Sequence, residues 1–143
     1  MLIGHLALVV AALFTGAAFY VNLAEQPARL DLKDQPLLAE WKKAYKRGFA
    51  MQGSLAMVGF LLGTLAWWQT GKLAFLAGAL LILANWPWTL VAIMPTNNAL
   101  MAIELDKAGP ETRALIVKWN RLHLVRTALG AFAALAFLIA LSG

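Results

Sequence analysis

Residues 73–94, LAFLAGALLILANWPWTLVAIM, decide the fold class of this chain. The segment has no charged residue, and it exceeds the roughly 20 apolar residues that a helix needs to cross a bilayer. Asn85 and Thr89 lie one helical turn apart within it, and an unmatched polar group in hydrocarbon costs several kcal/mol. We therefore predict a membrane-spanning helix in which Asn85 and Thr89 face the interior of the protein.

Three further segments, 2–24, 49–69 and 120–141, have a similar length and are also mostly apolar. The chain is 62% hydrophobic and 13% charged, whereas soluble domains are about 45–50% apolar and about 25% charged. We predict an all-α integral membrane four-helix bundle that forms a single domain over residues 1–143. The second and fourth helices, expected over about 36–69 and 110–141, are longer than the bilayer and should extend beyond it.

The basic residues cluster in two regions, after the first and after the third predicted span. Cytoplasmic connections carry an excess of Lys and Arg, so we expect a multi-pass protein of the cell inner membrane with both connections in the cytoplasm and both termini outside. This topology accounts for the net charge of +5 without nucleic acid as a partner. The first span has no basic residue before Arg29, which favours a true span over a signal peptide.

The absence of cysteine narrows the chemistry. It excludes disulfides, thiolate metal sites and the CxxC redox chemistry of quinone reductases, which also use small four-span bundles. His5 and His123 should lie near opposite faces of the membrane, so they cannot share a haem. Glu25 and His123 supply only two plausible metal ligands, fewer than the three of most catalytic sites. We expect no metal and no other cofactor.

Prolines should interrupt the helices. Pro87 leaves the carbonyl of Leu83 without its usual donor and should bend the third span. Residues 96–98 should form a turn or a helix start, followed by a short interfacial helix over 99–107. Gly109 and Pro110 should begin the last helix.

Polar side chains from all four spans lie at a similar depth in the membrane if successive spans cross it in opposite directions. All of them reach the cytoplasmic leaflet, whereas the outer half offers only His5 and isolated hydroxyls. The sequence therefore predicts one polar pocket at the cytoplasmic side, formed by Asn22, Glu25 and Arg29, by Trp41, Tyr45 and Gln52, by Asn85 and Thr89, and by Trp119, His123 and Arg126.

The motifs resemble those of one family when taken in order. They are Asn22-x-x-Glu25-x-Pro27-Ala28-Arg29, Trp41-x-x-x-Tyr45, Asn85-x-Pro87-x-Thr89 with Pro95-x-Asn97, and Trp119-x-x-x-His123-x-x-Arg126. Over nearly its whole length the chain resembles the anthrone-oxygenase-like family, small four-span membrane proteins largely carried as a domain of unknown function. The resemblance implies an oxidoreductase, a monooxygenase that converts anthrones to anthraquinones without flavin, haem or metal.

The residues are compatible with an oxygenase-like enzyme acting on a lipophilic aromatic, anthrone- or phenol-like substrate, although they leave open whether the chain is an enzyme. Such a substrate reacts with O2 once it is deprotonated, so the site needs a base and a group that stabilises an anion. We expect catalytic roles for His123, Glu25 and Arg126, and substrate contacts from Asn22, Arg29, Trp41, Tyr45, Asn85, Thr89, Asn97 and Trp119.

Other interpretations remain. The same polar groups could form a purely structural network, or the pocket could hold a lipid, a quinone or a partner helix without chemistry; a small transporter is less well supported because the outer half is apolar. The expected partners are the lipid bilayer and a lipophilic small molecule. Gly59 and Gly63 form a small-xxx-small pair, which could pair two copies as a homo-oligomer or serve packing within one chain.

Overall fold

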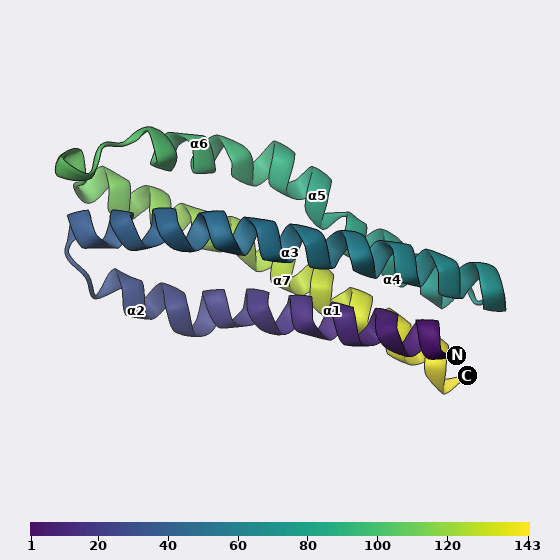
Figure 1. Cartoon of the computed structure of the whole chain (residues 1–143). Coiled ribbons are helices and arrows are strands. Elements are labelled where there is room, and N and C mark those ends of the chain that lie inside the picture. Colours follow the sequence, from purple (N-terminus) through teal and green to yellow (C-terminus); the bar gives the residue numbers. More distant parts are fainter.

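The computed structural model describes residues 1–143 and consists of helices and connecting turns, without a β-strand. Four helical rods, each long and apolar enough to cross a membrane, lie side by side (Figure 1). This confirms the predicted all-α four-helix bundle. The elements are α1 (Leu2–Tyr20), a π-helical turn (Val21–Glu25), α2 (Gln26–Leu30), α3 (Asp34–Thr70), α4 (Leu73–Leu83), α5 (Asn85–Trp88), a second π-helical turn (Thr89–Ile93), α6 (Met94–Ala102), a 3₁₀ turn (Leu105–Lys107) and α7 (Pro110–Ser142).

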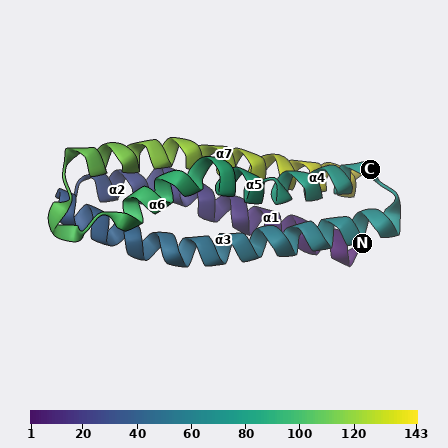
Figure 2. The same ribbon diagram turned by 90° about the horizontal axis from the view of Figure 1, so that it is seen from above.

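The two ends of the bundle differ. Both termini lie at one end, called here the terminal end, whereas the connections 31–33 and 103–109 lie at the other, called here the connection end (Figure 1). The helices α3 and α7 run through nearly the whole length of the molecule (Figure 2). α1 packs against α3 and α7, and α4 packs against the same two helices. The four rods therefore form a closed ring in the order α1, α3, α4 and α7.

The interior contains two separate apolar cores. The larger one fills the terminal half, where Phe14, Phe75 and Phe137 are its largest fully buried side chains. The smaller one lies at the connection end and is built around Trp41, Leu100 and Ile116. Polar residues of all four rods fall between these cores, so the sequence divides the bundle into apolar, polar and apolar layers.

Prolines produce two π-helical turns at the level of the polar layer. Pro27 and Pro95 have no amide hydrogen to donate to the carbonyl four residues back. Just before each proline the helix widens: Gln26 N–H bonds the carbonyl of Val21, and Met94 N–H bonds that of Thr89, five residues earlier in both cases. Such π-turns often occur at functional sites. Here they line the polar layer from two opposite rods.

The third rod differs in part from the prediction. It is interrupted at Ala84, close to the expected bend at Pro87. Of the two expectations for residues 96–98, the turn is wrong, whereas the helix start is close, because these residues lie near the beginning of α6 (Met94–Ala102). The separate helix expected over 99–107 is wrong, because α6 ends at Ala102. The π-turn allows the chain to pass Pro95 without leaving the helix. Only Leu105–Lys107 forms a short 3₁₀ turn, and α7 begins at Pro110 as expected.

Polar side chains close the connection end. Arg113 of α7 donates to the carbonyls of Leu30 (2.7 Å) and Leu32 (2.6 Å) and pairs with Asp34, whose Oδ1 lies 3.0 Å away. Lys42 of α3 donates to the carbonyls of Met101 and Ile103 at the end of α6. These bonds satisfy carbonyls that a helix end leaves without partners, and they fix the ends of α2 and α6 that carry the polar layer.

Glycines bring the rods into close contact in the terminal half. Gly59 lies against Ile82, and Gly63 and Gly78 lie against the ring of Phe137. The pair Gly59 and Gly63 is therefore used for packing within the chain, one of the two roles expected for it.

Replacing Gly78 with Ala should destabilise the bundle by about 1–3 kcal/mol, the usual cost of overpacking a core. Its Cβ would lie 2.5 Å from Phe137 Cε1 and 3.1 Å from the backbone oxygen of Ala133, which cannot move aside. Gly16→Ala is the matched control, since a Cβ there meets nothing within 4 Å. Thermal unfolding in detergent should show a lower midpoint for Gly78→Ala only. Equal midpoints for the two variants would contradict this packing.

Candidate functional site

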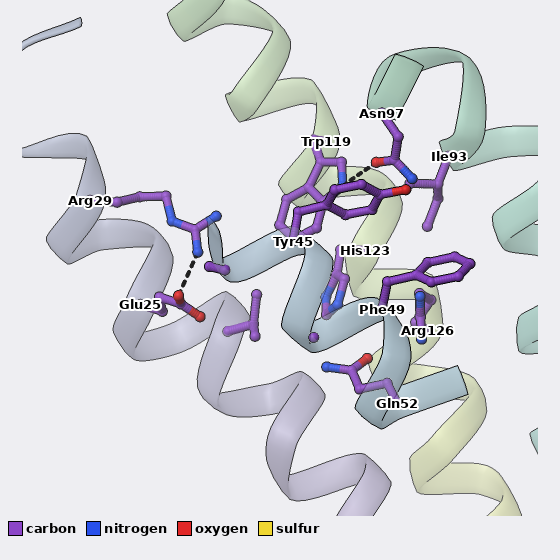
Figure 3. A pocket seen from close by; sticks show the side chains of 13 residues that line it. Glu25, Arg29, Tyr45, Phe49, Gln52, Ile93, Asn97, Trp119, His123 and Arg126 are labelled. Carbon is purple, nitrogen blue, oxygen red and sulfur yellow. Dashed lines mark hydrogen bonds and ion pairs between the residues drawn. The ribbon is translucent and has the colours of Figure 1, made fainter. Parts of the chain in front are cut away.

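A cavity of about 40 Å³ lies in the polar layer, and Figure 3 shows the side chains around it. We call it the main cavity. It receives residues from all four rods, so its shape depends on the whole bundle. It is lined by Val21, Glu25 and Arg29, by Ala44, Tyr45, Gly48, Phe49 and Gln52, by Ile93 and Asn97, and by Trp119, His123 and Arg126.

His123 is held by a directional hydrogen-bond network. Asn22 Nδ2 donates to the backbone carbonyl and to Oδ1 of Asn120, at 3.2 and 2.6 Å. A backbone carbonyl can only accept, so the other end of the Asn22 amide, Oδ1, is an acceptor. It lies 2.6 Å from Thr127 Oγ1 and 3.2 Å from His123 Nδ1. His123 therefore carries its proton on Nδ1, and its Nε2 is left with a free lone pair.

Aromatic rings support the same imidazole. Trp119 lies one helical turn before His123, and the two ring centroids are 4.8 Å apart. The fully buried Trp41 contacts Trp119 edge to face at 5.8 Å and stacks on Tyr45 at 4.9 Å. Asn97 Oδ1 accepts a hydrogen bond from Trp119 Nε1 at 2.8 Å. Trp41 thus lies behind the cavity wall and fixes Tyr45 and Trp119, which do line it.

Arg29 is fully compensated by two carboxylates. Its Nη2 lies 2.7 Å from Glu25 Oε1, and its Nε lies 2.8 Å from Glu40 Oε2. The guanidinium also lies 5.7 Å from the centre of the Trp119 ring. Glu25 and Arg29 lie four residues apart on the first rod, so one helical face presents both.

Arg126 has no such compensation. Its side chain is buried, with 7% of the residue exposed, yet none of the four ion pairs in the chain includes it. Its Nε is buried without a hydrogen-bond partner. The guanidinium carbon lies 5.6 Å from the centre of the Phe14 ring. A buried cation without a partner is costly, so this position is suited to an anion that the cavity receives.

Asn85 and Thr89 are buried, with 2% and 4% exposed, as the sequence predicts. They line a second, smaller space, which we call the side chamber. It measures about 10 Å³ and shares Phe49 and Arg126 with the main cavity. The two spaces therefore adjoin at these side chains. The lining of the side chamber consists of Phe49, Gly53, Ala56, Asn85, Trp86, Thr89 and Arg126.

The structure separates the candidate site residues into three groups. Seven line the main cavity: Glu25, Arg29, Tyr45, Asn97, Trp119, His123 and Arg126. Asn85 and Thr89 line the side chamber, while Asn22 and Trp41 lie behind His123 and Tyr45 and line neither space. No group of three or more His, Asp or Glu side chains is placed to hold a metal ion.

Sequence reasoning missed Phe49, Val21 and Ile93, whereas Gln52, which it placed in the polar pocket, does line the main cavity. Phe49 lies four residues after Tyr45, so the helical period of α3 could have indicated it. Val21 and Ile93 lie in the π-turns. The extra residue in each turn rotates the side chains around the helix axis, and the sequence does not indicate this rotation.

Comparison with known proteins identifies the family of this chain. A family model described as anthrone oxygenase matches residues 41–136. The chain belongs to the anthrone oxygenase family. A protein named anthrone oxygenase from Claviceps purpurea is 32% identical over 130 residues, which cover 80% of this chain and 74% of that protein.

Two further relatives carry similar names. Anthrone oxygenase tpcL of Aspergillus fumigatus is 27% identical over 131 residues, covering 85% of this chain and 81% of its own. Anthrone oxygenase AgnL2 of Paecilomyces divaricatus is 27% identical over 137 residues, covering 85% and 84%. No solved structure matches the chain. Membership of the anthrone oxygenase family indicates an oxygenase-like enzyme.

Asn22→Leu should change the tautomer of His123, because the acceptor that holds the proton on Nδ1 is lost. Nitrogen-15 NMR of histidine-labelled protein reports which ring nitrogen carries the proton. In the unmodified protein we expect a single Nδ1–H form, and in Asn22→Leu a mixture of both forms. The exposed His5, whose Nδ1 lies 2.8 Å from the carbonyl of Met1, serves as an internal reference. An Nε2–H form in the unmodified protein would contradict the proposed hydrogen-bond direction.

Proposed function

We propose that this protein is a membrane-embedded oxygenase that oxidises a lipophilic aromatic substrate of the anthrone or phenol type with O2 in the main cavity. The names of the relatives support the substrate class. The observation that carries the proposal within this chain is the placement of a neutral His123 beside the uncompensated Arg126. A base next to a buried cation is the combination that generates and then stabilises an anion.

The chemistry begins at His123 Nε2, which takes a proton from the substrate. The negative charge that develops on the substrate oxygen is stabilised by the Arg126 guanidinium, which has no competing carboxylate. Low local dielectric makes this interaction stronger than in water. The electron-rich anion then reacts with O2. Asn22 acts as a positioning residue, since it holds the imidazole so that the unprotonated nitrogen is available.

Substrate binding requires the main cavity to widen. A volume of about 40 Å³ holds roughly three water molecules, far fewer than the space that fused aromatic rings occupy. The wall formed by α3 is the part that can yield, because Ala44, Tyr45, Gly48 and Phe49 are only half-buried. Ala44 and Gly48 have small side chains, so displacement of the Tyr45 or Phe49 ring would open a passage toward the membrane.

We further propose that the connection end faces the cytoplasm. Basic residues gather in the connections and in the adjoining first turns of α3 and α7, whereas Lys72 is the basic residue of the opposite turn. The positive-inside tendency then places the main cavity in the cytoplasmic leaflet of the cell membrane. A lipophilic substrate dissolved in the bilayer could reach it at that depth.

Arg126→Met should lower the turnover number by about 100-fold, the usual loss when one donor to a developing anion is removed. Its thermal midpoint should stay equal or rise, since an apolar side chain replaces an uncompensated buried charge. Oxygen uptake with an anthrone in detergent or nanodiscs measures the rate. Arg121→Met, an exposed position five residues earlier on α7, is the matched control and should keep full activity. Full activity in Arg126→Met would remove Arg126 from the mechanism.

Gly48→Leu should weaken substrate binding strongly without loss of stability. A Cβ at Gly48 meets nothing within 4 Å, so the leucine side chain fills the cavity instead of clashing with packed atoms. Replacing a glycine within a helix also favours the helix by about 0.5–1 kcal/mol. The expected result is at least about a tenfold weaker quenching of tryptophan fluorescence by the substrate, with an unchanged or higher unfolding midpoint.

The matched control for Gly48→Leu is Gly16→Leu, because Gly16 has equally open surroundings but lies outside both cavities. It should bind substrate normally. If the two variants bind equally well, the main cavity is not the substrate site. Binding of a lipophile that is never converted by the unmodified protein would favour a non-enzymatic role.

A further inference from the structure

The side chamber brings together three buried polar atoms that have no protein partner. They are Asn85 Oδ1, Thr89 Oγ1 and Arg126 Nε. Each belongs to a side chain that is more than nine-tenths buried. An unsatisfied polar group in the interior typically costs about 1–3 kcal/mol. Three such atoms around one space indicate that the chamber holds a molecule able to bond all of them.

The chamber restricts that molecule by size and by charge. A volume of about 10 Å³ has room for about one water molecule, so the ligand has one or two heavy atoms. Asn85 Nδ2 donates to the carbonyl of Ile82 at 3.1 Å, which leaves Oδ1 as an acceptor. Arg126 is a cationic donor, and the Thr89 hydroxyl can do either. A metal cation is disfavoured by Arg126, and a simple anion by the Asn85 oxygen.

The ligand chemistry that remains is an oxygen atom carrying a proton. Such an atom donates to Asn85 Oδ1 and accepts from Arg126 and Thr89. Water and a hydroperoxide both fit this description. The rest of the lining is apolar or aromatic, and Trp86 Nε1 donates to the carbonyl of Gly53 at 3.3 Å, which satisfies that part of the wall.

We propose that the side chamber is a subsite for the outer oxygen of a substrate hydroperoxide and for the water that this oxygen becomes. The inference rests on the proposed function, because the hydroperoxide forms in the adjoining main cavity. Arg126 lines both spaces, so the same guanidinium can stabilise the substrate anion and then the oxygen that leaves it.

The reaction balances as follows for a substrate methylene. His123 removes one proton, and the carbanion forms a bond to O2, giving a peroxide anion that takes the proton back to become a hydroperoxide. A base then removes the remaining proton from the same carbon as the C=O bond forms. The O–O bond breaks with its electron pair on the outer oxygen, which takes up that proton and leaves as water. In total, one CH2 and one O2 give one C=O and one H2O.

Thr89→Val tests the subsite because it keeps the shape of the side chain and removes one bonding partner. O2 consumption and ketone formation are measured together with an anthrone as substrate. In the unmodified protein we expect one ketone per O2. In Thr89→Val we expect O2 uptake to persist while ketone per O2 falls at least about twofold, with the difference recovered as organic hydroperoxide. The control is Thr64→Val, which removes a hydroxyl that is also unpartnered but lies outside both spaces.

The outcomes separate the two proposals. No O2-dependent turnover by the unmodified protein would overturn the proposed function itself. Turnover with one ketone per O2 in both Thr89→Val and the unmodified protein would leave that function standing and overturn the subsite. Loss of O2 uptake and ketone in equal proportion would overturn the subsite as well.

A second measurement does not depend on the variant folding. Crystals of the unmodified protein are soaked in hydrogen peroxide, and the density between Asn85 Oδ1, Thr89 Oγ1 and Arg126 Nε is compared with that of unsoaked crystals. We expect a single-atom peak before soaking and a two-atom peak after it. An empty chamber in both crystals, or a single-atom peak unchanged by peroxide, would overturn the proposal.

Discussion

Hydrocarbon offers no hydrogen-bond partners, and this constraint organises the whole bundle. Each polar side chain within a span must find its partner inside the protein. The chain meets this requirement by collecting most of its polar side chains in one layer between two apolar cores. The network from Asn120 through Asn22 to His123 and Thr127 is the clearest example, because it joins the first rod to the fourth. Within this layer a few polar atoms are left without partners, and those of Gln52, Asn85, Thr89 and Arg126 belong to side chains that line the two cavities.

The π-turns explain how two rods present these polar groups. A π-turn contains one residue more than an α-turn, so side chains beyond it are displaced by about 100° around the helix axis. On the first rod this displacement turns Asn22 toward α7, while Glu25 and Arg29 face α3 and its Glu40. On the third rod it allows the helix to continue past Pro95, which brings Asn97 to Trp119. The prolines thus do more than bend the helix. They shift the register of its hydrogen bonds, and this shift changes the direction in which the following side chains point.

Much of the architecture could be predicted because it follows from local composition. Apolar length gives the four rods, and Asn85 and Thr89 are buried as an Asn and a Thr in a span should be. The spacing of Trp119, His123 and Arg126 in an uninterrupted helix correctly places all three on the cavity wall. Asn22 was expected beside the substrate instead of behind His123, since the sequence does not reveal a π-turn. The division into two cavities also depends on the side-chain position of Phe49, which no periodicity can supply.

The contrast between the two buried arginines shows what the polar layer can do chemically. Arg29 has two carboxylates within 2.8 Å, so its charge is already used to hold α2 to α3. Arg126 has none, although continuum arguments make an uncompensated buried charge unfavourable by several kcal/mol. A bundle stabilised only by its own contacts would gain from an apolar residue at this position. Arg126 lies between a cavity that suits an aromatic anion and a chamber that suits one oxygen atom. A negative charge that develops on the substrate during the reaction would explain why a cation is present there. The energetic cost in the resting protein is then offset when the anion forms.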